Sequence, residues 1–124
     1  MRIETITYFT EIEEGFVKLL IAIGLKETVA KVLVYLAHVP KATSREIERG
    51  VGLRQPEVSI AIRQLLERKW VAYEDTQERA LGRPLRSYYL SKPVHSIVDR
   101  IETEKKEEVN ESLSQVKNLR NYIS

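Results

Sequence analysis

A pair of glycines in the middle of the chain constrains how the segments around it can fold. Gly50 and Gly52 end a short helix that begins at Thr43, where Glu46 three residues later completes a capping box. A second helix begins near Gln55, only a few residues further on, and runs to about Lys69. The central part of the chain is therefore predicted to be a short helix, a tight turn and a second helix.

The second of these helices is amphipathic, with apolar residues at the three- and four-residue spacings of a helix that packs one face on a core. The predicted buried residues are Val58, Ala61, Ile62, Leu65 and Leu66. A rotation of about 100° per residue places Ile60, Arg63, Gln64 and Glu67 on the opposite face, with Glu57 and Ser59 beside them. This outer face carries the polar groups that a partner could contact.

A β-hairpin with a basic tip is predicted after the second helix. Trp70 to Tyr73 and Leu85 to Leu90 have strand character, and Asp75 to Pro84 is predicted to be a polar loop between them. Residues 79–92 contain four basic residues and no acidic residue. A local basic stretch favours a polyanionic partner, and a solvated loop is the alternative.

Long helices are predicted on both sides of this central block. The N-terminal helix has an apolar seam at Ile6, Phe9, Ile12, Phe16, Leu19 and Ile23, and Gly24 ends it. The next helix carries Val29, Val32, Leu33 and Leu36 on one face and ends before Pro40. A C-terminal helix runs from Val94 to about Tyr122. Its apolar residues recur at Ile97, Ile101, Val109, Leu113, Val116 and Ile123.

Composition excludes several classes of protein. The 124 residues contain no cysteine, so disulfides and thiolate metal sites are absent, and no apolar run is long enough for a membrane helix. The two histidines, His38 and His95, are not clustered with other potential ligands. No nucleophile elbow or glycine-rich phosphate loop is present. We therefore expect a cytoplasmic protein that is not an enzyme, with no metal, no cofactor and no membrane association.

The block from Thr43 to Leu90 resembles the winged helix-turn-helix of prokaryotic, and in particular archaeal, transcriptional regulators of the MarR, ArsR and TrmB kind. The resemblance rests on the segments Thr43–Ile47, Gly50–Leu53, Gln55–Ser59 and Leu65–Val71. It implies a mainly helical fold with a small β-hairpin and long flanking helices. It also implies that the second helix of the motif enters the DNA major groove and that the hairpin contacts the adjacent backbone or minor groove.

The resemblance implies that residues on the outer face of the second helix and on the wing contact DNA. They are Arg54, Gln55, Glu57, Ser59, Ile60, Arg63 and Gln64 on the helix and Arg79, Arg83 and Arg86 on the wing. Arginine pairs with guanine, glutamine with adenine, and an aliphatic side chain meets the thymine methyl group. Arg54 cannot act as an N-cap, so it points either to a phosphate or to solvent. Glu57 is repelled by phosphates unless it accepts a hydrogen bond from cytosine.

The flanking helices are predicted to hold a homodimer, because one small domain cannot cover both apolar seams. The candidate dimer residues are Phe9, Ile12, Phe16, Leu19, Ile97, Ile101, Val109, Leu113 and Val116. Packing of the C-terminal helix on its own N-terminal helix is the alternative. Residues 1–92 are then the N-terminal helix and DNA-binding domain, with its core at 25–92, and residues 93–124 are the dimerisation helix. The expected function is sequence-specific binding of double-stranded DNA, with an unknown effector, and the alternative is a protein-interaction module in a larger complex.

Overall fold

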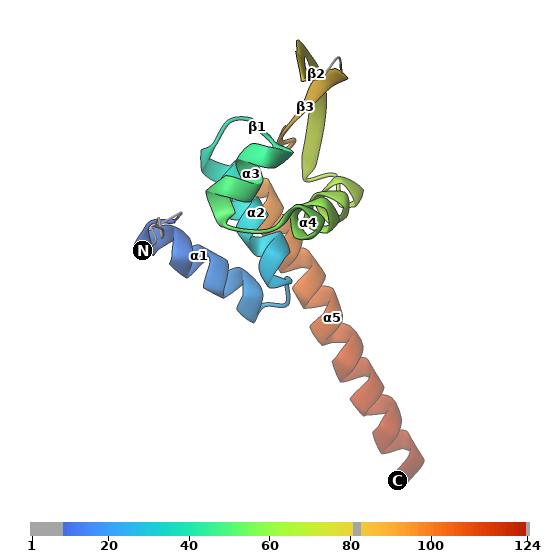
Figure 1. Cartoon of the computed structure of the whole chain (residues 1–124). Coiled ribbons are helices and arrows are strands. Elements are labelled where there is room, and N and C mark those ends of the chain that lie inside the picture. Colours follow the sequence, from blue (N-terminus) through green and yellow to red (C-terminus); the bar gives the residue numbers. More distant parts are fainter. Residues whose placement is uncertain (1–8, 81–82, 124) are drawn as a thin grey trace. The chain divides into compact units, whose positions relative to one another are not determined.

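The computed structural model describes residues 9–80 and 83–123, and the side chains of residues 9–75 and 85–123. The chain divides into two compact units, residues 1–91 and residues 92–124. The first unit contains four helices and three strands in its described part. These elements are α1 (Glu11–Ala22), α2 (Glu27–His38), β1 (Ala42–Thr43), α3 (Ser44–Val51), α4 (Gln55–Glu67), β2 (Val71–Ala80) and β3 (Arg83–Leu90). Figure 1 shows the helices of this unit gathered together and the β2–β3 hairpin extending from them.

Helix α3 begins and ends where the sequence predicts. The Thr43 hydroxyl accepts from the Glu46 N–H at 3.2 Å, and the Glu46 carboxylate accepts from the Thr43 N–H at 2.9 Å. Gly52 closes the helix in the left-handed conformation, with φ of 73° and ψ of 32°. The capping box and the glycine turn are therefore confirmed. They set the point at which the chain turns from α3 into α4.

The N-terminal helix is shorter than predicted. Its expected residue Ile6 lies outside the described residues, and α1 starts at Glu11 with Thr10 as its N-cap. Thr10 and Glu13 form a second capping box, which fixes this start. Gly24 has φ of 119°. The Gly24 and Leu25 N–H groups donate to the carbonyl oxygens of Ile21 and Leu20 in the last turn, as expected where a glycine ends a helix.

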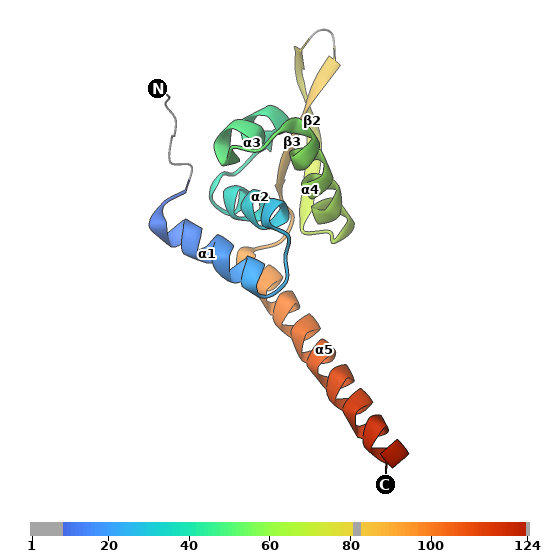
Figure 2. The same cartoon turned by 60° about the horizontal axis from the view of Figure 1, so that its bottom comes forward.

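The core of the first unit is built around α2, six of whose residues are buried. It packs on α1, α3 and α4, and their buried residues complete the core. Those of α3 and α4 are Ile47, Val51, Val58, Ala61, Ile62 and Leu65. The predicted buried stripe of the second helix is thus confirmed at four positions, and Leu66 is partly exposed. Figure 2 shows α2 lying among the other helices of this unit.

The sheet has the strand order β1-β3-β2, with both pairs antiparallel. The short strand β1 was not predicted; it pairs Ala42 with Tyr88 and Thr43 with Ser87. The prediction of a loop from Asp75 to Pro84 is wrong, because β2 continues to Ala80 and β3 begins at Arg83. A shift in register between Asp75 and Arg79 accommodates the irregular, polar part of β2. Backbone pairing therefore extends the hairpin through a segment whose side chains have no strand pattern.

The second unit is one helix, α5 (Val94–Ile123), which agrees with the predicted C-terminal helix. It runs without interruption over 30 residues. Ile97 and Ile101 are buried, whereas the residues from Glu107 onward are exposed to its end at Ile123. No helix in the described ranges is both long and apolar enough to cross a membrane.

Candidate nucleic-acid interface

Helix α4 presents a mixed polar and aliphatic face to solvent. Gln55, Ser59, Ile60 and Arg63 are exposed, and Gln64 is partly exposed. Ile60 keeps 48% of its surface in contact with solvent, although Ala61 and Ile62 beside it are buried. Arg63 makes no hydrogen bond or ion pair with any residue that the structure describes. The exposed face of α4 thus combines the Arg63 guanidinium, which has no partner among the described residues, with amide side chains and the aliphatic side chain of Ile60.

The start of α4 is stabilised by a residue that was proposed to contact DNA. The Glu57 carboxylate accepts a hydrogen bond from the Arg54 N–H at 2.9 Å. Arg54 makes no side-chain cap, as expected for a group with no acceptor atom. Its guanidinium Nε lies 3.8 Å from Glu57, and its side chain remains 85% exposed. Glu57 therefore has a structural role at the helix start, and Arg54 is available at the surface.

The wing carries the second group of candidate contacts. Arg79 lies in β2 and Arg83 begins β3, but their side chains, like residues 81 and 82, fall outside the described parts of the chain. Arg86 is described, and it is not free. Its Nε donates to Asp75 at 3.2 Å, and its guanidinium carbon lies 3.8 Å from the centre of the Tyr73 ring. The hydrogen bond to Asp75 is the main reason why the pKa of Arg86 is raised, so the residue stays charged.

Asp75 is a residue that the sequence reasoning missed, because it was assigned to a loop. In the structure its Cα is paired directly with that of Arg86 across the two strands. Tyr73 and Tyr88 form the next pair on the same face, with ring centres 6.1 Å apart in an edge contact. Strand alternation would have placed these four residues together had the hairpin been predicted at its full length.

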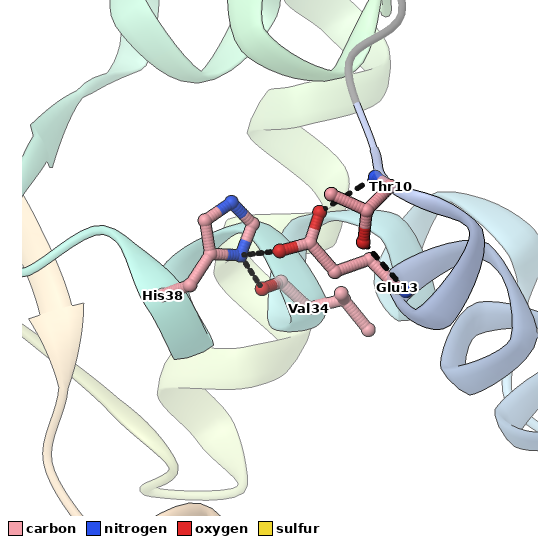
Figure 3. A network of polar contacts seen from close by, with 4 residues as sticks. All are labelled: Thr10, Glu13, Val34 and His38. Carbon is pink, nitrogen blue, oxygen red and sulfur yellow. Dashed lines mark hydrogen bonds and ion pairs between the residues drawn. The ribbon is translucent and has the colours of Figure 1, made fainter.

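Polar contacts attach α1 to the end of α2 (Figure 3), and aromatic contacts add to them. The Glu13 carboxylate that closes the cap of α1 also lies 3.2 Å from His38 Nδ1. The same nitrogen is 3.0 Å from the Val34 carbonyl oxygen. Both neighbours are acceptors, so Nδ1 carries a proton in this arrangement. The rings of Phe9 and Tyr35 make edge contacts with His38, which joins the N-terminal segment to the helical core.

The proposed dimer residues fall into two groups. Phe9, Ile97 and Ile101 are buried, and Phe16 is partly buried. The exposed residues are Ile12 at 84%, Leu19 at 68%, Val109 at 53%, Leu113 at 62% and Val116 at 45%. On α1 the predicted seam is therefore not the buried face, which instead contains Val17 and Leu20. No group of three or more potential metal ligands occurs in the described part of the chain.

Residues 23–80 match the model of the MarR family. No curated protein matches the sequence. Among solved structures, the archaeal chromatin protein TrmBL2 is 17% identical, with a TM-score of 0.70 over 90% of this chain and 40% of that one. A MarR-family regulator from Silicibacter pomeroyi is 15% identical, with a TM-score of 0.54 over 81% of this chain and 64% of that one. The ST1889 protein of Sulfolobus tokodaii is 17% identical, with a TM-score of 0.58 over 82% of this chain and 98% of that one.

The chain thus spans less than two thirds of the length of TrmBL2 and of the Silicibacter protein, and at these identities the likeness shows the fold. The matched segment contains α2, α3 and α4 together with β2, which are the elements that carry the turn, the outward helix face and the wing. The chain thus has a winged helix-turn-helix fold, and the part of it that matches the MarR family model, residues 23–80, is a little under half of the sequence.

Proposed function

We propose that this protein is a transcriptional regulator that binds double-stranded DNA in a sequence-specific manner, with α4 in the major groove and the β2–β3 wing beside it. The observation that carries the proposal is the exposed face of α4. Arg63 offers paired donors to guanine, Gln55 and Gln64 can pair with adenine, and Ile60 offers an aliphatic surface to a thymine methyl group. The wing supplies cations for the phosphate backbone. A role on chromosomal DNA would place the protein in the cytoplasm.

The direct test is a selection of binding sites from random duplex DNA at a stated salt concentration, because affinity for DNA depends strongly on salt. We expect an enriched sequence with approximate two-fold symmetry. Arg63→Ala should weaken binding to that sequence by about 1–3 kcal/mol and relax the preference at one base pair. Gln64→Ala, at the partly exposed edge of the same face, provides a milder comparison. Equal weakening on selected and random duplexes would show that Arg63 contacts a phosphate instead of a base.

We further propose that the regulator is a homodimer held by its terminal helices, with residues 93–124 as the main dimerisation element. The support is the exposed apolar stripe of α5, which continues beyond Val109, and the exposed Ile12 and Leu19 of α1. Large apolar groups at helical spacing favour a partner helix. Analytical ultracentrifugation of the intact chain and of residues 1–92 tests this proposal. A monomeric intact chain would contradict it, and a truncated chain that remains equally dimeric would place the interface elsewhere.

A protein-interaction module is the second candidate function, and the exposure of Ile60 favours it. An aliphatic residue at 48% exposure on the central outer face suits a protein partner as well as a thymine methyl group. Ile60→Asp separates the two functions. Loss of DNA binding supports the regulator that reads DNA through α4, whereas unchanged DNA binding with loss of a co-purifying protein supports the interaction module.

A further inference from the structure

The stem of the wing contains four side chains that the fold brings onto one face of the hairpin. Tyr73 is paired with Tyr88, and Asp75 with Arg86, across β2 and β3. Because side chains alternate between the two faces of a strand, residues two apart share a face. We refer to Tyr73, Asp75, Arg86 and Tyr88 as the stem cluster. Its contacts lie within the first unit and involve only described side chains.

Arg86 is held from two directions inside the stem cluster. The Tyr73 ring supports the flat face of the guanidinium at 3.8 Å, and the Asp75 carboxylate accepts from Nε at 3.2 Å. An aromatic face and a carboxylate are both strong partners for a guanidinium group. The side chains of Arg86 and Asp75 are nevertheless 47% and 51% exposed. The pair is therefore formed at the surface, where a dissolved polyanion can reach it.

A phosphate and a carboxylate compete for the same guanidinium, because both present a pair of anionic oxygen acceptors that match its donors. In the free protein Asp75 occupies this role and cancels the charge of Arg86. A DNA phosphate that approaches the stem meets a neutral pair, with a carboxylate 3.2 Å from the cation that it would contact. An exposed ion pair contributes little to stability, so an exchange of partners is energetically accessible.

We propose that Asp75 is an internal counterion that limits the affinity of the wing for DNA of any sequence, because it pairs with Arg86 and restrains that residue from contacting DNA phosphates. This inference rests on the proposed function, in which the wing lies beside DNA. Phosphate contacts are the same at every sequence, so a free arginine in the wing raises the affinity for all duplexes alike. Neutralising one arginine lowers this background binding and leaves the discrimination to α4. Asp75 thus lowers the affinity for every duplex by a similar factor and leaves unchanged the preference between sequences that α4 sets.

The chain offers a matched control one residue away. Glu74 lies on the same strand, is 48% exposed and forms an ion pair with Lys41. Its Cα is paired with that of Ser87, so its side chain leaves the opposite face of the hairpin. Glu74→Gln removes the same charge as Asp75→Asn and also frees a cation. It separates the loss of a negative charge near the wing from the release of Arg86.

The experiment measures binding to poly(dA–dT) and poly(dG–dC) duplexes by fluorescence anisotropy over a range of salt concentrations. For Asp75→Asn we expect about a three- to tenfold gain in affinity on both duplexes, with the slope of log affinity against log salt steeper by about 0.9. Glu74→Gln should change the affinity by less than about twofold. The double variant Asp75→Asn/Arg86→Gln should lose both the gain in affinity and the added slope.

Several results would overturn the inference. They are an unchanged or weakened affinity of Asp75→Asn, an equal gain with Glu74→Gln, or a gain that persists in the double variant. Thermal melting of each variant checks that the fold is intact, and a variant with reduced melting is replaced by Asp75→Ser. If the wild type binds neither duplex nor any selected sequence, the proposed function fails and the inference with it. A wild type that binds while Asp75→Asn shows no gain contradicts the inference alone.

Discussion

Helices α2 and α5 are both amphipathic, but they meet solvent in opposite ways. Six of the 12 residues of α2 are buried, whereas only two of the 30 residues of α5 are, and both lie in its first turns. The apolar side chains of α2 therefore find partners within the first unit. Those of α5 from Val109 onward remain at the surface. The same helical periodicity thus predicts a buried face in one helix and an exposed stripe in the other, and only the second invites another molecule.

The strongest test of this contrast removes a side chain from the packed unit. Leu65 of α4 is fully buried against the core that α2 organises. Leu65→Ala leaves a cavity and should lower the free energy of unfolding by about 2–5 kcal/mol. Urea denaturation followed by circular dichroism gives the value. Leu119→Ala in α5, where the side chain is 66% exposed, should cost far less in a monomeric sample. Similar losses at both positions would erase the contrast.

The exposed stripe of α5 is tested by adding a charge to it. Leu113→Asp should weaken dimerisation by about 2 kcal/mol or more, roughly 30-fold in the dissociation constant, because a carboxylate would enter an apolar interface. Ser114→Asp is the matched control, since it places the same charge one residue away, at an exposed position outside the stripe. Sedimentation velocity over a range of concentrations measures both variants. If both dissociate equally, the interface does not use this stripe.

The close approach of α3 to α2 gives a smaller effect. A Cβ added at Gly50 would lie 2.2 Å from Cε1 and 2.5 Å from Cζ of Tyr35. The ring of Tyr35 is packed at its edge on His38, so it cannot move freely. Overpacking costs about 1–3 kcal/mol, and alanine regains up to about 1 kcal/mol as a better helix former. We expect Gly50→Ala to lower the free energy of unfolding by about 1 kcal/mol.

Gly15→Ala provides the comparison, because a Cβ at that position meets no atom within 4 Å. It should stabilise the protein slightly through helix propensity alone. Thermal melting of the two variants under the same conditions measures the difference. A Gly50→Ala protein as stable as Gly15→Ala would show that Tyr35 moves aside without cost.

The smallest predicted effect is a pH dependence at Tyr35. Burial and then the nearby Glu46 carboxylate raise its pKa above the ordinary value of 10.0. The unfolded chain therefore loses this proton first as the pH rises, so the tyrosine favours the folded state below about pH 10 and less above it. The free energy of unfolding should fall as the pH increases beyond that point. The free energy of unfolding of Tyr35→Phe should fall less steeply over the same pH interval. An identical fall in both proteins would show that Tyr35 is not the cause.

Local signals in the sequence predicted much of the fold. The capping box of Thr43 and Glu46, the glycine stop at Gly52 and the boundary before Pro40 act over a few residues, so they can be read without knowing the tertiary structure. The periodicity of α4 predicted which of its faces is buried and left Ile60 outside, as the structure has it. The start of α1 was missed, although Thr10 and Glu13 form the same kind of capping box.

Contacts between distant residues decided what the sequence left open. The short strand β1 was not predicted, and it forms because Ala42 and Thr43 pair with Tyr88 and Ser87 of β3. Arg86 was predicted to contact DNA, and the pairing of β2 with β3 places it beside Asp75, 11 residues earlier. A strand pattern was absent from the wing because backbone hydrogen bonds, which carry no side-chain signal, extend the hairpin there.

The sequence by itself determined the helix-turn-helix, the long C-terminal helix and the apolar stripes on both flanking helices. Each of these follows from side-chain periodicity, caps and turn residues, which are local properties. Only the tertiary structure decided which side of α1 is buried, because Val17 and Leu20 form one apolar edge and Ile12 and Leu19 another. It also decided which arginines are already paired. Both depend on which surfaces meet once the chain has folded, and that is a property of packing between elements distant in sequence.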